Sequence, residues 1–145
     1  MLKIDSQEKN LLKEIAQKYS IELLLLFGSQ VFKKTHPESD FDIGYLSKKT
    51  LSIEEEGQLM IEIAQVLKIP LEKIELVSLR GASPLLLKEV FTNSLVLYAK
   101  DDLIFDRYKI YAFRYFEESQ AIFEQMRKIL EKKIEDYKRE LSHPK

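Results

Sequence analysis

Cysteine and tryptophan are both absent from this 145-residue chain. The absence of cysteine excludes disulfides, thiolate metal sites and a cysteine nucleophile, and it fits a reducing environment. Histidine is nearly absent, since only His36 and His143 are present. A metal site built from several histidines, or a catalytic triad that depends on histidine, is therefore not expected.

An excess of charge of one sign and long apolar runs are also missing. Lys and Arg total 23 and Asp and Glu total 24, a formal net charge of -1, so DNA binding is not expected. No apolar run approaches the about 20 residues that span a bilayer, so no membrane association is expected. The start, MLKIDSQEKN, lacks the basic and apolar regions of a signal peptide, and a cytoplasmic location is expected.

The chain is long enough for one domain with a core and too short for two comfortable ones. Repeats and Gly/Ser linkers are absent, and the candidate boundary lies near residues 99–103. Before it helices and strands alternate, and after it the pattern is helical. We therefore expect an α+β domain over residues 1–100 and a C-terminal helical extension over 101–145.

Capping residues mark the helix starts in the first part of the chain. Asp5 and Ser52 each precede a glutamate by three residues, as in a capping box, and predict helices over 6–19 and from 53 toward Pro70. Ser83 followed by Pro84 predicts a short helix to about residue 92. Apolar segments predict strands over 22–27, 40–46, 73–79 and 95–98, of which the first is apolar enough to be buried on both faces.

No proline or glycine interrupts residues 101–141. Apolar residues recur there at intervals of three and four, which predicts one long helix or a broken pair. Its apolar stripe has three open uses: binding a partner, packing on the chain's own core, or forming a homo-oligomer. The stripe includes Phe116, Phe123, Met126, Leu130 and Tyr137.

Two acids follow a glycine turn in an unusual arrangement. The leucine run ends in Gly28-Ser29, ten residues pass, and Asp40-Phe41-Asp42 opens the next strand. Strand alternation places both aspartates on one face, where they would repel each other without a cation between them. Magnesium prefers such oxygen ligands. A turn at Gly28 lets the backbone approach a phosphate, and Ser29 adds a hydroxyl.

A third acid, Glu75, lies on the next predicted strand. It could complete a site for two Mg²⁺ ions about 3.5 to 4 Å apart, or accept the proton of an attacking hydroxyl. Three cationic residues, Lys33, Lys34 and Arg80, are weaker candidates for contact with a triphosphate.

These residues resemble the nucleotidyltransferases of the DNA polymerase beta superfamily, and specifically the minimal nucleotidyltransferase (MNT) domains. The signature of that family is Gly-Ser, ten residues, then Asp-x-Asp, and the segment 28–42 has this spacing. The similarity continues through KIELVSLRGASPLLLKEVFTNSLVLY and covers about residues 8–98. The resemblance implies a nucleotidyltransferase fold, a small mixed β-sheet with helices packed on one face.

The resemblance also implies roles for the residues. Asp40 and Asp42 would bind Mg²⁺, Gly28 and Ser29 would contact the nucleotide phosphates, and a third acid would help to activate the acceptor. That acid is usually aspartate in the family, whereas this chain has Glu75. The longer side chain still reaches a metal, but it changes the metal geometry and can slow the reaction.

MNT proteins of the MntA-like group pair with HEPN proteins in toxin–antitoxin modules, and they can transfer AMP from ATP to a tyrosine of the toxic ribonuclease. A HEPN-type toxin is thus the expected partner, with ATP as the substrate. Two alternatives stay open. One is a binding module that neutralises a partner by contact, with weak catalysis. The other is a small-molecule nucleotidyltransferase, although such enzymes usually have a larger acceptor-binding domain.

Overall fold

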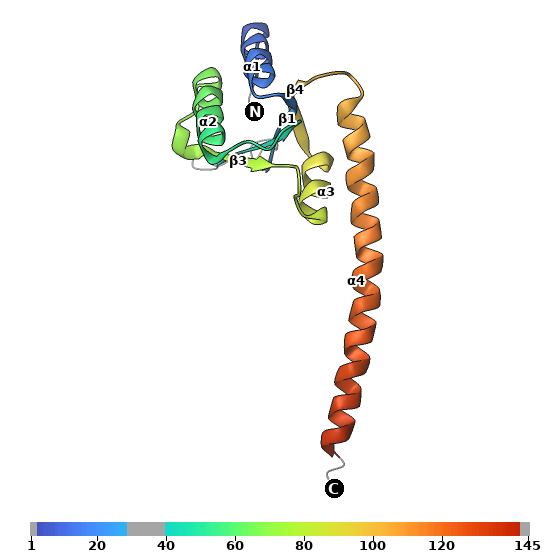
Figure 1. Ribbon diagram of the computed structural model, residues 1–145. Helices are drawn as coiled ribbons and strands as arrows, with labels where there is room; N and C mark the ends of the chain where they lie inside the picture. The colour runs from blue at the N-terminus through green and yellow to red at the C-terminus, as the bar shows by residue number, and fades with distance from the viewer. Residues whose placement is uncertain (1–2, 29–39, 143–145) are drawn as a thin grey trace.

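The computed structural model describes residues 3–28 and 40–142 (Figure 1). The predicted helices and all four predicted strands are present, with ends shifted by a few residues. The long C-terminal segment is one helix rather than a broken pair. In chain order the elements are α1 (Ser6–Lys18), β1 (Ile21–Phe27), β2 (Phe41–Ser47), α2 (Ile53–Leu67), the short 3-10 helix η2 (Leu71–Lys73), β3 (Ile74–Ser78), α3 (Pro84–Thr92), β4 (Ser94–Ala99) and α4 (Ile104–Ser142).

The three predicted capping residues begin their helices. The Asp5 side chain accepts a hydrogen bond of 2.7 Å from the backbone N–H of Glu8, three residues later in the chain. Ser52 and Glu55 form a reciprocal capping box, with both hydrogen bonds at 3.1 Å. Ser83 caps α3 by accepting a hydrogen bond from the third residue after it. These caps satisfy backbone donors that a helix start leaves without partners.

The four strands form one mixed sheet in the order β3-β2-β1-β4. β1 pairs antiparallel with β2 on one side and with β4 on the other, whereas β2 and β3 are parallel. The parallel pair brings the starts of β2 and β3 to the same edge of the sheet, next to the end of β1. The α+β class and the mixed sheet agree with the sequence prediction.

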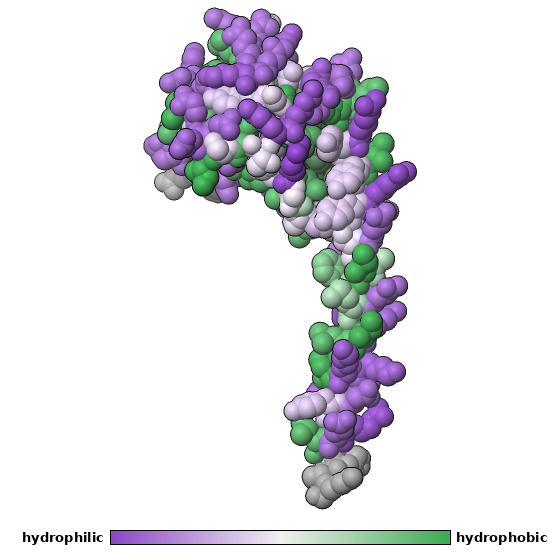
Figure 2. Space-filling view, viewed as in Figure 1, coloured by the Kyte–Doolittle hydropathy of each residue, from purple (hydrophilic) through white to green (hydrophobic). Residues whose placement is uncertain are grey.

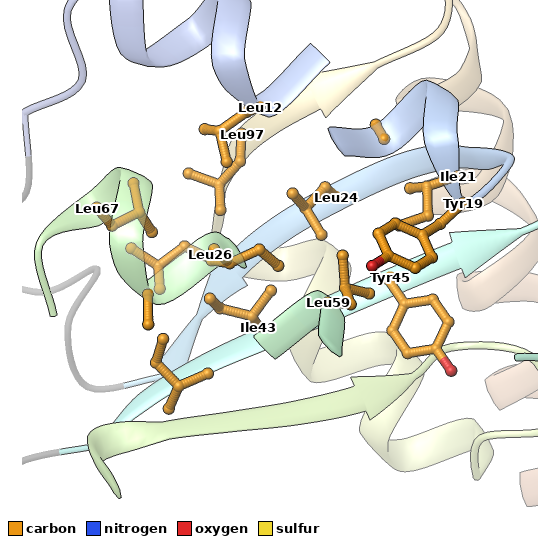
Figure 3. Packing of buried hydrophobic residues seen from close by; sticks show 14 of the residues in the cluster. Leu12, Tyr19, Ile21, Leu24, Leu26, Ile43, Tyr45, Leu59, Leu67 and Leu97 are labelled. Carbon is orange, nitrogen blue, oxygen red and sulfur yellow. The ribbon is translucent and has the colours of Figure 1, made fainter. Parts of the chain in front are cut away.

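Helices cover both faces of the sheet, so the expectation of helices on one face is wrong. Leu24 and Leu26 of β1 pack into a core with α1 and α2 (Figure 3). Leu23 and Leu25 point to the opposite face and pack with α3 and the start of α4. A strand that is apolar on both sides can be buried only between two layers, which is the physical reason for the second layer.

α4 is partly packed and partly free. Ile104 and Ala112, in its first turns, are buried in the same core as α3, and the rest of the helix projects from the domain (Figure 1). Apolar side chains form a band along the projecting part in Figure 2, and Phe123, Met126 and Leu130 are 58 to 60% exposed. This exposure excludes packing of the band on the chain's own core. Among the described residues, no helix has the length and apolarity to cross a membrane.

Candidate functional site

The paired starts of β2 and β3 bring two of the predicted site residues together. Asp42 lies directly opposite Glu75 in the parallel register, and the two carboxyl groups are hydrogen-bonded. Asp40 precedes β2, is exposed, and is close enough for its charge to act on Asp42. The sequence therefore identified three acids that the fold places at one edge of the sheet.

The surroundings of Asp42 disfavour its ionised form. Burial raises the pKa of Asp42 to about 6, with further contributions from the hydrogen bond to Glu75 and the negative charges of Glu75 and Asp40. Asp42 is half-buried, whereas Glu75 is exposed. A cation placed between the two carboxyl groups would relieve the repulsion that helps to raise this pKa.

Gly28 follows β1 and lies against Asp42. Its φ of +84° is a left-handed conformation that favours glycine. A Cβ added at Gly28 would come within 3.2 Å of Asp42 Cγ and would collide with the carboxylate. The backbone of Gly28 is thus held next to the acid pair, where a phosphate could approach it closely.

The acidic face of β2 is open only at the start of the strand. A Cβ on Gly44, two residues after Asp42, would lie 2.9 Å from Leu79, and Leu46 further on is buried under the α3 and α4 layer. The face to which strand alternation assigns the aspartates is therefore accessible at Asp42 and covered at the other end of β2. Glycine inside a strand often marks such a close approach, and the sequence contained that signal.

The acid pair fits a hard divalent cation by its chemistry. Mg²⁺ is bound through one or two protein carboxylates together with phosphate oxygens, and Asp42 and Glu75 supply two carboxylates in contact. Among residues 3–28 and 40–142, however, no three acidic or histidine side chains are grouped closely enough to hold a metal ion. The metal-binding roles of Asp40, Asp42 and Glu75 stay predictions. Ser29, Lys33, Lys34 and both histidines lie outside the described residues.

Arg80 does not lie beside the acid pair. It comes five residues after Glu75, beyond the end of β3, and its guanidinium donates hydrogen bonds to the backbone carbonyls of Ser47 and Lys48. These carbonyls lie at the end of β2, whereas Asp42 lies at its start. The suggested contact of Arg80 with a triphosphate in the acid site is therefore wrong.

Ser94 is a residue of this edge that the sequence interpretation missed. In the sheet register it lies opposite Phe27, and Phe27 lies opposite Asp42 on the other side, so all three share one face. The Ser94 hydroxyl is buried and has no hydrogen-bond partner among the described residues. A serine directly before an apolar strand was the available signal, and it is too common in sequences to stand out.

Comparison with solved structures identifies the same fold in toxin–antitoxin complexes. A chain from a toxin–antitoxin structure with AMP-PNP superposes with a TM-score of 0.67 at 23% identity, covering 84% of this chain and 97% of that one. A chain from the structure of the tri-AMPylated Shewanella oneidensis HEPN toxin in complex with an MNT antitoxin gives a TM-score of 0.62 at 21% identity, covering 88% of this chain and 98% of that one. The MntA–HepT toxin–antitoxin gives 0.62 at 21% identity, covering 87% and 98%. These likenesses establish the fold.

Sequence comparison assigns the family. Comparison with curated protein sequences finds no match. The family model described as polymerase beta, nucleotidyltransferase matches residues 10–103, which is more than half of the chain and includes Gly28, Asp42 and Glu75. The chain therefore belongs to the polymerase beta nucleotidyltransferase family.

Proposed function

We propose that this protein is a Mg²⁺-dependent nucleotidyltransferase that transfers AMP from ATP to a tyrosine hydroxyl of a HEPN-type toxin and so acts as its antitoxin. The observation that carries the proposal is the hydrogen-bonded pair of Asp42 and Glu75 beside the backbone of Gly28. This arrangement places acids for a metal next to a backbone turn for a phosphate, in a chain of a nucleotidyltransferase family.

The chemistry assigns each residue a task. The acceptor oxygen attacks the α-phosphorus of ATP, the bond from that phosphorus to the α–β bridging oxygen breaks, and pyrophosphate leaves. Gly28 and Ser29 bind phosphate, and Glu75 takes the proton that the hydroxyl loses. Bound Mg²⁺, held by Asp40, Asp42 and Glu75, would neutralise the charge that develops on the phosphate oxygens.

The proposed acceptor is a protein, and the described residues contain no second unit that would bind a small acceptor. Between β4 and residue 142 the described chain forms α4, which packs through its first turns and then projects from the domain (Figure 1). The related folds in complexes with a HEPN toxin, one of them AMPylated, support this choice of partner. The exposed apolar band of α4 is the surface proposed to contact the toxin.

The test combines the protein with Mg²⁺, ATP labelled on the α-phosphate, and a co-expressed HEPN protein. Label should appear on the toxin, and Asp42→Asn should lower the rate by at least about 100-fold, because it removes a charged metal ligand. Glu72→Gln is the matched control, since Glu72 is an exposed acid three residues before Glu75. An unmodified toxin in a stable complex would instead support the binding module.

A further inference from the structure

A pocket of about 520 Å³ opens on the α3 and α4 side of the sheet, away from the acid pair. Its floor is apolar and includes Leu46, Leu79 and Leu87, all buried. Leu46 follows Asp42 by four residues on the same strand, which corresponds to about 13 Å. The volume falls within the range of small-molecule sites in proteins, and neither Asp42 nor Glu75 is among the residues that line the pocket.

Three tyrosines of α4 form one wall of this pocket. Tyr108, Tyr111 and Tyr115 follow one another at helical spacing, with ring centroids 6.2 Å apart in the first pair and 5.8 Å in the second. The rings of Tyr111 and Tyr115 are stacked at 25°. Tyr111 is 53% exposed, so its ring leaves area on which another flat ring can stack.

Two arginines give the pocket its charge. Arg80 is held in place by the carbonyls of Ser47 and Lys48, and Arg107 is exposed on α4 without an ion pair to any described residue. Among the described residues, none of those that line the pocket is an aspartate or a glutamate. A guanidinium presents several N–H donors in one plane, which suits phosphate oxygens.

We propose that this pocket binds a nucleoside phosphate, separately from the substrate ATP and without a divalent cation. The base stacks on Tyr111 and Tyr115, and the phosphate is held by Arg107 and Arg80. Stacked aromatic rings beside guanidiniums match a ligand that joins a flat ring to an anion. The described residues of the lining offer no carboxylate to Mg²⁺, so the phosphate is expected to bind there without it.

Equilibrium titration of the full chain with AMP in the presence of EDTA tests the proposal. EDTA removes the cation on which the acid site depends, so the remaining binding reports the pocket. Arg107→Gln should weaken AMP binding by about tenfold, because it removes a charged hydrogen bond to phosphate. Arg114→Gln is the matched control, since it removes the same charge from the same helix outside the pocket lining.

Two tyrosine variants test the stacking. Tyr111→Ala should weaken binding of AMP and leave that of ribose 5-phosphate unchanged, whereas Tyr111→Phe should keep both. Asp42→Asn should not change AMP binding in EDTA, so the result is independent of the proposed transfer reaction. Circular dichroism verifies that each variant is folded.

Three results would overturn the proposal. The first is no AMP binding by the folded protein in EDTA. The second is equal weakening by Arg107→Gln and Arg114→Gln, which would mean attraction to general positive charge. The third is equal affinity for AMP and ribose 5-phosphate, which would mean that the base is not bound.

Discussion

Asp42 and Glu75 lie opposite each other on the parallel strands β2 and β3, and burial, the hydrogen bond between the two carboxyl groups and the negative charge of Glu75 raise the pKa of Asp42 to about 6. In the proposed site, a cation between the two carboxylates would relieve their repulsion. The proposed metal binding and the pH dependence of the metal-free protein therefore depend on the same pair of acids.

Asp42 makes the metal-free protein less stable as the pH rises. Its pKa is raised from 3.8 to about 6, so between these values the folded state holds a proton that the unfolded state releases. The free energy of unfolding in EDTA should accordingly fall from pH 4 to pH 6 and then level off. Asp42→Asn should remove this part of the decline in urea unfolding curves, whereas Glu72→Gln should keep it.

Mg²⁺ should stabilise the protein through the same acids. A ligand that binds only the folded state adds about 2.7 kcal/mol at 100 times its Kd. Millimolar Mg²⁺ at neutral pH should therefore raise the Tm of the wild type in thermal unfolding and have little effect on Asp42→Asn. An equal rise in both proteins would assign the effect to general surface charge and contradict the metal site.

Gly28 is constrained both by its positive φ and by its contact with Asp42, and alanine variants of three glycines measure these two effects separately. Gly57, in α2, has neither a positive φ nor an atom near an added Cβ, whereas Gly81 has a φ of +77° and open space. Gly57→Ala should raise the unfolding free energy by about 0.5 to 1 kcal/mol, and Gly81→Ala should lower it by about 1 kcal/mol. Gly28→Ala should lower it further, because its Cβ also collides with Asp42.

The rate of nucleotidyl transfer should also distinguish the glycine variants. Gly28→Ala should reduce nucleotidyl transfer by at least about tenfold, since the added methyl displaces Asp42 and fills space beside the proposed phosphate position. Gly57→Ala should leave the rate unchanged. Full activity of Gly28→Ala would show that the phosphate does not approach this backbone.

Much of the fold could be predicted from the sequence because it depends on local signals. Asp5, Ser52 and Ser83 begin helices through their own side chains, and these caps need no information from distant residues. The absence of proline and glycine likewise allowed α4 to continue unbroken. The predicted single layer of helices failed because it ignored a consequence of the leucine run: Leu23 and Leu24 point to opposite faces, so each requires its own cover.

The candidate site was predictable in part for a similar reason. Gly28 directly follows β1 and Asp42 lies at the start of β2, and these two strands are antiparallel neighbours in which Asp42 lies opposite Phe27. A motif that joins two consecutive neighbouring strands can be recognised from its spacing in the sequence. Arg80 was misplaced because sequence distance from Glu75 does not tell which end of a strand a residue joins. Ser94 was missed because its position beside Phe27 depends on a strand pairing that spans most of the domain.

Glu62 joins α1 and α2 through two hydrogen bonds. Lys18 Nζ and the Tyr19 hydroxyl each donate to its carboxylate at 2.6 Å. Burial acts to raise the pKa of Glu62, but these donors and the charge of Lys18 outweigh it and lower the pKa. The stabilisation is therefore present above the ordinary pKa of 4.5 and is lost as the pH falls below it.

Glu62→Gln should reduce stability at pH 7 by about 1 kcal/mol and should show a smaller loss on going from pH 5 to pH 3. Urea unfolding at each pH measures both effects. Glu14→Gln, at an exposed position on α1, is the control and should change neither. Equal behaviour of the two variants would contradict a stabilising role for the Glu62 hydrogen bonds.

The exposed band of α4 should separate toxin binding from folding. Phe123 is 60% exposed and far from the buried part of the helix, so Phe123→Glu should leave the Tm within about 2 °C of the wild type. The same change places a charge in the proposed apolar interface and should weaken capture of the HEPN protein by at least about tenfold. Gln125→Glu adds the same charge two residues away, on another side of the helix, and should keep capture intact. If Phe123→Glu instead kept capture but changed the sedimentation of the protein alone, the band would join two copies of this chain rather than bind the toxin.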